Sequence, residues 1–290
     1  MKHSILITGA SGKTGKAVIA KLSSEGHRIF AFTHKEEYVK ELIALGASGV
    51  RVGDLRSDID LEISLTGMDG IYHICPNMTA DEFEIGKNII RLCGKHSVSR
   101  FVYHSVIHPH IRQMPHHWQK MQVEEELFKS KLDYTILQPT AYFQNIMGYV
   151  NMILDGVYPM PYSTSARISM VDLRDVAAAV AKVFESSITI HGIYEIVGTL
   201  PISQTEIARL LTASLKKPVQ AVEMSKTDWQ ENARRSNMPE YTRETLLAMF
   251  EYYDKFGLEG SSLALTYLLG RNPITMEQFL LDEFGKIGST

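Results

Sequence analysis

The feature that most constrains this chain is a glycine-rich segment near the N-terminus, residues 8–15, with the sequence TGASGKTG. An apolar run at residues 5–8 precedes it, and residues 15–24 follow with apolar side chains at helical spacing. Between a strand and a helix, three glycines allow a tight turn, the approach of an anionic group to the backbone, and close helix–strand packing. A purely structural turn is the alternative, but the flanking strand and helix favour a phosphate-binding loop at the helix N-terminus.

Segments typical of strands and of helices alternate through the first half of the chain. Runs of β-branched and aromatic residues occupy 5–8, 29–33, 49–52, 70–74, 101–105 and 134–137, and helical periodicity marks 15–24, 36–45 and 81–96. Strands that alternate with helices of this length indicate βαβ crossovers and a parallel sheet with helices on both faces. The sequence therefore predicts the α/β class, with a Rossmann-type doubly wound parallel sheet.

The end of the predicted second strand, Thr33-His34-Lys35, bears on which dinucleotide the glycine loop binds. In NAD-binding sheets an acidic residue here holds the adenosine ribose 2′-hydroxyl, and this chain has no carboxylate before Glu36. Lys35, together with Lys13 inside the loop, favours the 2′-phosphate of NADP(H), because cations form charge-assisted hydrogen bonds with it. The alternative is that both are solvated surface lysines.

Further cofactor contacts are predicted in the glycine loop and after the later strands. Asp54 is placed to hold the adenine and Leu55 to cover it, although Asp54 also suits an ordinary turn. Tyr142 and Phe143 follow the sixth strand, where each can either stack near the nicotinamide or pack between lobes. The predicted contacts in these segments are Gly9, Ser11, Gly12, Lys13, Thr14, Gly15, Thr33, His34, Lys35, Asp54, Leu55, Cys75, Pro76, Tyr142 and Phe143.

The second half of the chain is patterned differently, because most of it is helical. Residues 168–198 again contain strand-like runs, around a helix that either Asp172 or Arg174-Asp175 caps. We therefore predict a dinucleotide-binding Rossmann domain over residues 1–150, to whose sheet this segment returns. A smaller, mainly helical lobe for substrate or partner is predicted over residues 151–290.

Charge and cysteine content exclude several classes of protein. The chain has 30 Lys and Arg against 33 Asp and Glu, a net charge of −3, so nothing indicates a surface for nucleic acid or an anionic membrane. No stretch approaches the roughly 20 apolar residues that span a bilayer, and the N-terminal apolar run is too short for a signal peptide. The 2 cysteines, Cys75 and Cys93, have no CxxC spacing, which predicts free thiols and a cytoplasmic location.

Several motifs resemble those of the NmrA-like branch of the atypical short-chain dehydrogenases/reductases, over nearly the whole chain. They are TGASGKTG at 8–15, FVYHS at 101–105, YTILQP at 134–139 with Asn145 downstream, DLRDVA at 172–177 and LLGRNP at 268–273. The glycine loop occurs in many reductases, whereas YTILQP with its downstream Asn is more specific to this branch. The resemblance implies a Rossmann domain and a smaller C-terminal lobe with NADP(H) between them, and either a reductase or a redox-sensing regulator.

The resemblance also identifies candidate catalytic residues. Ordinary short-chain dehydrogenases use a Ser, and a Tyr four residues before a Lys; Ser105 and Lys120 match, but His116 stands in place of the Tyr. The resemblance implies that Lys120 contacts the nicotinamide ribose hydroxyls. His116 and Lys120 share a helical face by their i, i+4 spacing, and Pro115 suits the first turn of that helix. We predict that His116 is neutral, because of the helix N-terminus and the ammonium, and donates a hydrogen bond to the substrate.

Five of the 11 histidines lie between positions 104 and 117, namely His104, His108, His110, His116 and His117. No thiolate or suitably spaced carboxylate completes a zinc site there, so no metal is predicted. We expect His108 and His110 to line or cap a mobile loop over the cofactor, and His104 to be a core residue. Ser105 is not predicted to be a hydrolase nucleophile, because the Gly-X-Ser-X-Gly elbow is missing around it.

Together these features predict an NADPH-dependent oxidoreductase that transfers a hydride to a quinone-like, carbonyl or aromatic unsaturated small molecule. Positioning by the fold and Lys120 would supply most of the catalysis, with a proton from His116 or water. The alternative is a non-catalytic NADP(H) sensor that acts through a protein partner. The missing tyrosine favours the sensor, and the retained Lys120 and Ser105 favour the enzyme; a homodimer is compatible with both.

Overall fold

The computed structural model describes residues 2–285, which fall into two compact units. The first unit contains the chain up to Arg112, His116–Pro139 and Val176–Tyr194. The second unit contains Gln113–Pro115, Thr140–Asp175 and the chain from Glu195 onward. The chain therefore leaves the first unit after its sixth strand and returns to it for most of one helix.

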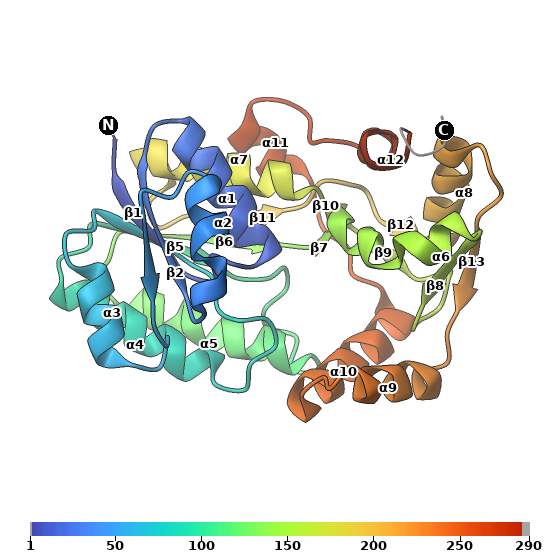
Figure 1. Ribbon diagram of the computed structural model, residues 1–290, viewed down its shortest axis with the longest axis horizontal. Helices are drawn as coiled ribbons and strands as arrows, with labels where there is room; N and C mark the ends of the chain where they lie inside the picture. The colour runs from blue at the N-terminus through green and yellow to red at the C-terminus, as the bar shows by residue number, and fades with distance from the viewer. Residues whose placement is uncertain (1, 286–290) are drawn as a thin grey trace. The chain divides into compact units, whose positions relative to one another are not determined.

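The first unit is built around a seven-stranded sheet (Figure 1), whose strand order is β11-β6-β5-β4-β1-β2-β3. Its strands are β1 (Ser4–Ile7), β2 (Arg28–Thr33), β3 (Gly49–Val52), β4 (Gly70–His73), β5 (Arg100–His104), β6 (Tyr134–Pro139) and β11 (Ile193–Ile196). Strands β1 to β6 pair in parallel, with Ile5 of β1 opposite both Ile29 and Gly70. The strand order changes direction between β1 and β4, so the carboxyl ends of these two strands form the switch point where such sheets bind ligands. The predicted Rossmann-type sheet is confirmed.

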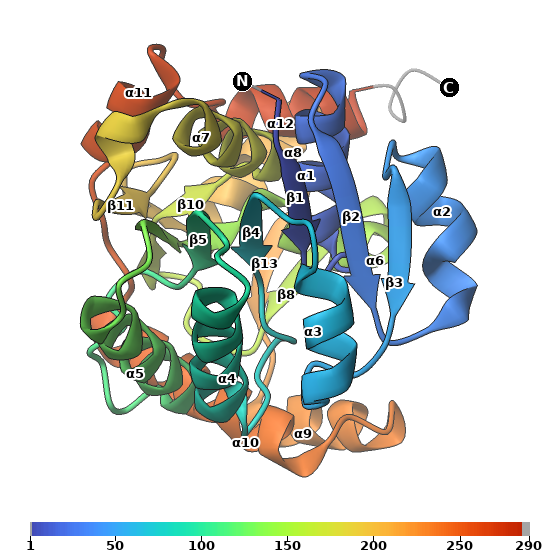
Figure 2. The ribbon, with the colours of Figure 1, turned by 90° about the vertical axis from the view of Figure 1, so that its left-hand side faces the viewer.

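Helices cover both faces of this sheet. They are α1 (Lys13–Ser24), α2 (Val39–Ala44), α3 (Asp58–Leu65), α4 (Glu82–Lys95), α5 (Pro115–Lys129) and α7 (Leu173–Glu185), with short 3₁₀ turns at Glu36–Tyr38 and Ser187–Thr189. Figure 2 shows α3, α4 and α5 on one side of the sheet, and α1, α2 and α7 on the other. Leu61, Ile89 and Val123 of the first group join Leu6 of β1 in one buried apolar cluster. Since successive strand residues face opposite sides, Ile5 and Ile7 serve the other face.

Helix α3 is not indicated by its sequence pattern. In DIDLEISL, polar and apolar residues alternate with the period of two that is typical of a strand. The segment is nevertheless helical, because a serine N-cap accepts a hydrogen bond from the first turn and Leu61 and Leu65 are buried. Ile59 and Ile63 are left 72% and 59% exposed. The helix predicted over 36–45 is also shorter, since its first three residues form a 3₁₀ turn.

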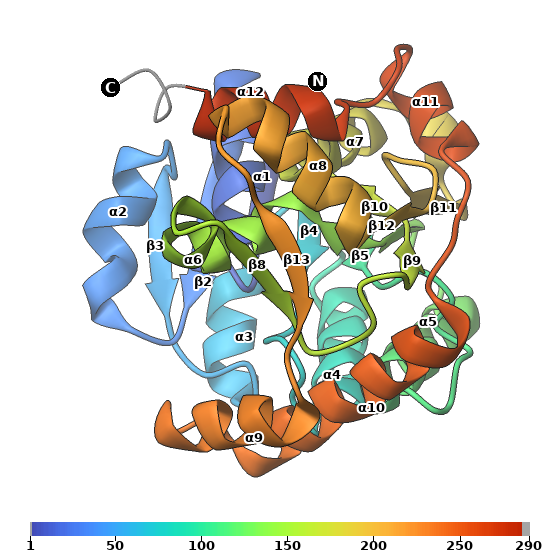
Figure 3. The same cartoon turned by 90° about the vertical axis from the view of Figure 1, so that its right-hand side faces the viewer.

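The second unit combines small sheets with helices (Figure 3). Three two-stranded sheets pair β7 (Ala141–Tyr142) with β10 (Met170–Val171), β9 (Arg167–Ile168) with β12 (Ile202–Ser203), and β8 (Val157–Met160) with β13 (Gln220–Glu223). The helices are the 3₁₀ segment η2 (Phe143–Tyr149), α6 (Val150–Leu154), α8 (Gln204–Leu215), α9 (Lys226–Arg235), α10 (Glu240–Phe256), α11 (Leu263–Leu269) and α12 (Met276–Phe284). No helix in the part of the chain that the structure describes is long and apolar enough to cross a membrane.

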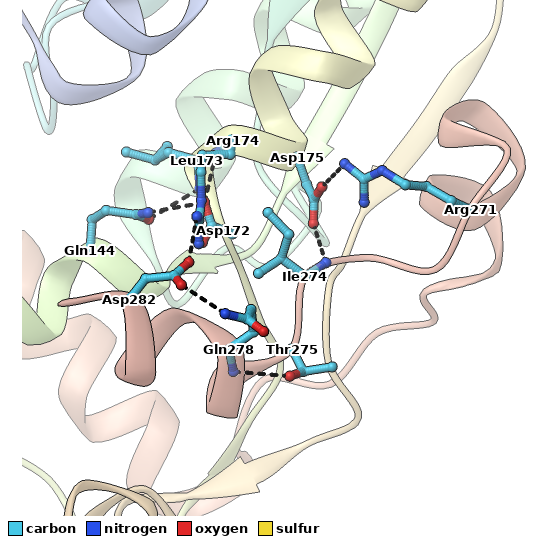
Figure 4. A network of polar contacts seen from close by, with 10 residues as sticks. All are labelled: Gln144, Asp172, Leu173, Arg174, Asp175, Arg271, Ile274, Thr275, Gln278 and Asp282. Atoms are coloured by element: carbon cyan, nitrogen blue, oxygen red, sulfur yellow. Dashed lines mark hydrogen bonds and ion pairs between the residues drawn. The ribbon is translucent and has the colours of Figure 1, made fainter. Parts of the chain in front are cut away.

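Helix α7 begins in a polar network of the second unit (Figure 4). Asp172 caps it, because its carboxylate accepts a hydrogen bond from the Arg174 amide at 2.7 Å. The Arg174 guanidinium binds both Asp172 and Asp282 of α12, each at 2.7 Å. Gln144 donates to Asp172 and accepts from the Leu173 amide, both at 3.1 Å. Of the two predicted caps, Asp172 is therefore the one that serves α7.

Asp175 extends this network toward the segment before α12. Its carboxylate binds the Arg271 guanidinium at 2.7 Å and accepts a hydrogen bond from the Ile274 amide at 2.6 Å. The Asp172 and Asp175 side chains are both fully buried, at 0% exposure. Since a buried carboxylate is unfavourable without partners, these contacts stabilise the second unit only as a complete set.

Candidate functional site

The glycine loop forms a cradle at the start of α1. Gly9 has a φ of +59°, and a Cβ there would lie 2.9 Å from the Ile74 carbonyl oxygen. A Cβ at Gly15 would lie 2.4 Å from the Gly9 carbonyl oxygen, so the helix packs on the loop at a distance only glycine allows. Gly12 precedes α1 without a side-chain cap, and the first turn has no acidic residue. An uncapped helix N-terminus of this kind is suited to a phosphate group.

The residues that follow β2 lie at the same sheet edge as the glycine loop, because β1 and β2 are parallel neighbours. Thr33 is buried, whereas His34 and Lys35 are exposed. Lys35 forms an exposed ion pair with Glu37 at 3.4 Å, an interaction that is weak in water. The Lys35 ammonium is therefore able to exchange this partner for a more strongly charged phosphate.

The predicted contacts after β3 and β4 differ in exposure. Asp54 is exposed, and its carboxylate accepts hydrogen bonds from the Arg56 amide and guanidinium at 2.9 and 3.3 Å. Leu55 is 7% exposed and belongs to the apolar core of the first unit. After β4, Cys75 is buried and Pro76 is exposed. Burial, and then the nearby Glu82 carboxylate, raise the pKa of the Cys75 thiol well above its usual range.

Lys120 lies on α5, which begins at Pro115 as the sequence predicts. Its ammonium binds the Glu82 carboxylate at 2.6 Å and donates a hydrogen bond to the His104 carbonyl at the end of β5, at 3.2 Å. It also lies 5.6 Å from the centre of the Tyr103 ring. The structure thus brings Lys120 to the carboxyl end of β5, the strand next to β4 of the switch point.

Polar contacts connect this position to the glycine loop. The Thr8 hydroxyl, next to Gly9, lies 2.8 Å from His73 Nδ1 at the end of β4. The His73 ring stacks on Tyr103 at 5.9 Å. Burial, and then the Lys120 ammonium, lower the pKa of His73 to about 3, so this histidine is neutral at pH 7. Loop, β4, β5 and α5 therefore form one site within the first unit, which we call the Lys120 site.

Glu82 is the functional candidate that sequence reasoning missed. Its side chain is 2% exposed, and its carboxylate also accepts a hydrogen bond from the Tyr103 hydroxyl at 3.1 Å. One signal was present in the sequence: Glu82 shares the buried face of α4 with Ile85 and Ile89, where a charged residue is unusual. A carboxylate on an apolar helical face indicates a buried partner, but not which one.

His116 is buried, with 7% of its surface exposed. Its ring meets His117 edge-to-face at 4.5 Å, and Nδ1 has no hydrogen-bond partner among the described residues. Burial, and then the neighbouring His117 and Lys120, lower the pKa of His116 to about 2. The ring is therefore neutral at pH 7, chiefly through desolvation rather than the helix N-terminus.

The hydroxyl of Ser105, which the resemblance suggests is catalytic, is hydrogen-bonded in the interior of the first unit. Its hydroxyl donates a hydrogen bond to the buried Glu124 carboxylate, which also accepts one from Gln138 at 2.9 Å. Burial raises the pKa of Glu124 despite these bonds. Because its proton is engaged with Glu124, Ser105 here supports the interior between β5, β6 and α5.

The remaining histidines of the 104–117 segment have local partners. His104 Nδ1 lies 2.5 Å from the Tyr72 hydroxyl, and burial lowers the pKa of His104 to about 3, as fits a core residue. His117 Nδ1 donates to the backbone carbonyl of His108 at 3.1 Å, and His108 has a positive φ of 52°. Within residues 2–285, no group of three or more His, Cys, Asp or Glu is arranged to hold a metal ion.

Tyr142 and Phe143 belong to the second unit. Phe143 is fully buried and packs on Phe279 of α12 at 5.4 Å. Tyr142 is partly exposed and pairs with Val171 between β7 and β10. Packing within the second unit thus accounts for Phe143, and a cofactor contact for either residue stays a prediction.

Comparison with known proteins identifies the family and agrees with the fold. The model of the NmrA-like family matches residues 1–280. An NAD(P)H azoreductase from Xenophilus azovorans is 24% identical over 281 residues, which cover 95% of this chain and 96% of that protein. The NADPH complex of an NADPH-dependent quinone oxidoreductase from Escherichia coli superposes with a TM-score of 0.83 at 24% identity, covering 97% and 99% of the two chains. NmrA, a negative transcriptional regulator crystallised with NADP, gives a TM-score of 0.81 at 17% identity, covering 99% and 97%.

Proposed function

The chain belongs to the NmrA-like family, and from that premise we propose that it is a reductase that uses NADPH to reduce a quinone-like, carbonyl or aromatic unsaturated acceptor. Its azoreductase and quinone oxidoreductase relatives support this proposal, since both act on conjugated acceptors. Their similarity extends over 95% and 94% of this chain, so it includes both units.

The first unit fits NADP(H). Gly9 and Gly15 let the loop pack closely against Ile74 and the start of α1, where a Cβ would clash, and the uncapped amides that open α1 suit the pyrophosphate. Lys13 and Lys35 would hold the 2′-phosphate, and Lys120 the nicotinamide ribose hydroxyls. When bound, the cofactor supplies the hydride.

One observation carries the proposal: two partners hold the Lys120 ammonium, and its third N–H has no partner among the described residues. An ammonium has three N–H donors, and the Glu82 carboxylate and the His104 carbonyl account for two of them. The third donor remains for a ligand hydroxyl at the carboxyl end of β5. A lysine held in this way positions a bound ribose without adding mobility to the site.

The acceptor also needs a proton after hydride addition. A neutral His116 is a poor proton donor, but its ring N–H is able to donate a hydrogen bond that orients the acceptor. We therefore assign to His116 the orientation of the acceptor, and to water the delivery of the proton.

Replacing Lys120 tests the proposal. Lys120→Met is expected to lower kcat/KM by about 100-fold, because a misplaced nicotinamide ribose takes the reacting atoms out of position. NADPH oxidation would be followed by absorbance with a panel of quinones, azo dyes and carbonyl compounds. Lys129→Met is the matched control, because Lys129 lies on the same helix and is 58% exposed. The proposal fails if the unmodified protein oxidises NADPH with no acceptor of the panel.

A non-catalytic NADP(H) sensor with a protein partner is the second candidate. It is favoured by His116, which occupies the position of the usual tyrosine and is neutral and buried. A sensor would bind NADPH without turnover, and binding would change its oligomeric state or its affinity for a partner. Sedimentation with and without NADPH, beside the turnover panel, separates the two candidates.

Both cysteines bear on the proposed location. Cys75 and Cys93 are free and buried. Unpaired thiols suit a reducing compartment, which supports a proposed location in the cytoplasm.

A further inference from the structure

We propose that Glu82 is a positioning residue for the reductase site: its buried carboxylate holds the Lys120 ammonium in place for the nicotinamide ribose. This inference rests on the proposed function. It adds a residue from α4, which contributes none of the motifs discussed above.

The geometry of the pair is that of a buried ion pair. Glu82 Oε1 lies 2.6 Å from Lys120 Nζ, and the two side chains are 2% and 14% exposed. The same oxygen accepts the Tyr103 hydroxyl proton at 3.1 Å, so the carboxylate is fixed from two directions. Because Glu82 and Lys120 come from different helices, the pair also links α4 to α5.

The carboxylate determines how the ammonium is presented. With one N–H directed to Glu82 and a second to the His104 carbonyl, rotation about the last side-chain bond is blocked. A single donor is left for the ligand, in one orientation. Without Glu82, the His104 carbonyl alone would hold the ammonium, and its rotation would be free.

Glu82 is also the main source of negative charge for Lys120. The other titratable groups around the ammonium are His73 and Cys75 at the end of β4, Tyr103 and His104 of β5, and His116, His117 and Glu124 of α5. Burial keeps these histidines neutral, and Glu124 is bonded to Ser105 and Gln138. Among the described residues, Glu82 is the carboxylate in ion-pair contact with Lys120.

Glu82→Gln removes this charge while keeping the side-chain shape. A neutral amide accepts a weaker hydrogen bond from the ammonium than a carboxylate does, so Lys120 would be held less firmly for the ribose.

The test is NADPH affinity, measured by calorimetry on the full chain at neutral pH. Glu82→Gln is expected to weaken binding about tenfold or more, since a misplaced positioning group has large effects. Glu84→Gln is the matched control, because Glu84 lies on the same helix and is exposed.

Combining Glu82→Gln with Lys120→Met distinguishes a positioning role of Glu82 from a general loss of structure. In Lys120→Met, adding Glu82→Gln should produce no further loss of NADPH affinity, because the residue through which Glu82 acts is absent. Equal losses in both backgrounds would overturn the proposal. So would an unchanged NADPH affinity for Glu82→Gln beside a clear effect of Lys120→Met.

Glu82→Asp keeps the test decisive if Glu82→Gln does not fold. The shorter carboxylate retains the charge but moves it, so NADPH affinity should fall; an unchanged affinity would contradict the proposal. These binding curves require no turnover. If no acceptor is reduced, the reductase proposal fails while the Glu82 assignment is still tested.

Discussion

Each unit contains a network of buried charged groups, and the two networks differ in whether all of their polar atoms have partners. In the second unit, Asp172 and Asp175 are fully buried, and their carboxylates bind Arg174, Arg271 and the Ile274 amide of the same unit. In the Lys120 site, two of the three N–H donors of the Lys120 ammonium have partners among the described residues, and the third has none. Two buried nitrogens near it, His73 Nε2 and His116 Nδ1, have no hydrogen-bond partner among the described residues.

This difference indicates what each network does. A complete network of buried charges stabilises a fold and offers nothing to a ligand. Buried polar atoms without partners destabilise the protein, and a bound ligand or water is one way to satisfy them. The second-unit network is therefore structural, and the incomplete Lys120 site is where binding and chemistry are expected.

The largest expected effect is the loss of stability in acid, which acts through the buried histidines of the Lys120 site. Burial lowers the pKa of His73 and His104 to about 3, of His116 to about 2 and of His117 to about 4. These rings stay neutral in the folded protein but take up protons in the unfolded chain below about pH 6.5. Their contribution to stability is thus complete above that pH and is lost as the pH falls toward their folded pKa values. The free energy of unfolding should fall by up to about 1.4 kcal/mol per pH unit for each ring.

Urea unfolding at a series of pH values between about 7 and 5 measures this slope. His117→Gln should make the slope shallower, whereas replacement of the exposed His34 should leave it unchanged. A free energy of unfolding that stays flat over this range would show that the four rings are not held neutral.

Opening the complete network should have the next largest effect. Asp172→Ala removes the α7 cap and leaves Arg174 with Asp282 alone, which should lower the free energy of unfolding by about 3 kcal/mol. Glu277→Gln is the control, since Glu277 is an exposed residue of α12. A loss below about 1 kcal/mol in denaturant titration would mean that the network is not a unit.

The smallest effect is expected at the exposed Lys35 after β2, outside both networks. Lys35→Ala should reduce the preference for NADPH over NADH by about three- to tenfold, because an exposed cation contributes only a modest free energy. The dissociation constants of both coenzymes measure it, with exposed Lys40→Ala of α2 as the control. Tighter binding of NADH than of NADPH by the unmodified protein would reverse the cofactor assignment.

Much of the fold and part of the site could be predicted from local pattern. The glycine loop, the parallel strands and the Asp172 cap depend on residues close together in sequence, so their signals are readable there. Helix α3 was missed because its alternating pattern is that of a strand, and its serine cap and the burial of Leu61 and Leu65 outweigh that pattern. Ser105 was predicted in the site, and only its contact with Glu124 shows where its proton is engaged.

The sequence by itself determined most strands and helices of the first unit, and the glycine loop that opens the first helix, because backbone geometry and hydrophobic periodicity act over a few residues. Only the tertiary structure decided which buried charges meet. Glu82 and Lys120 are 38 residues apart, and Arg174 and Asp282 are 108 apart. Such pairs form because desolvated charges need partners, and packing of the whole chain, not local preference, determines which partner is within reach.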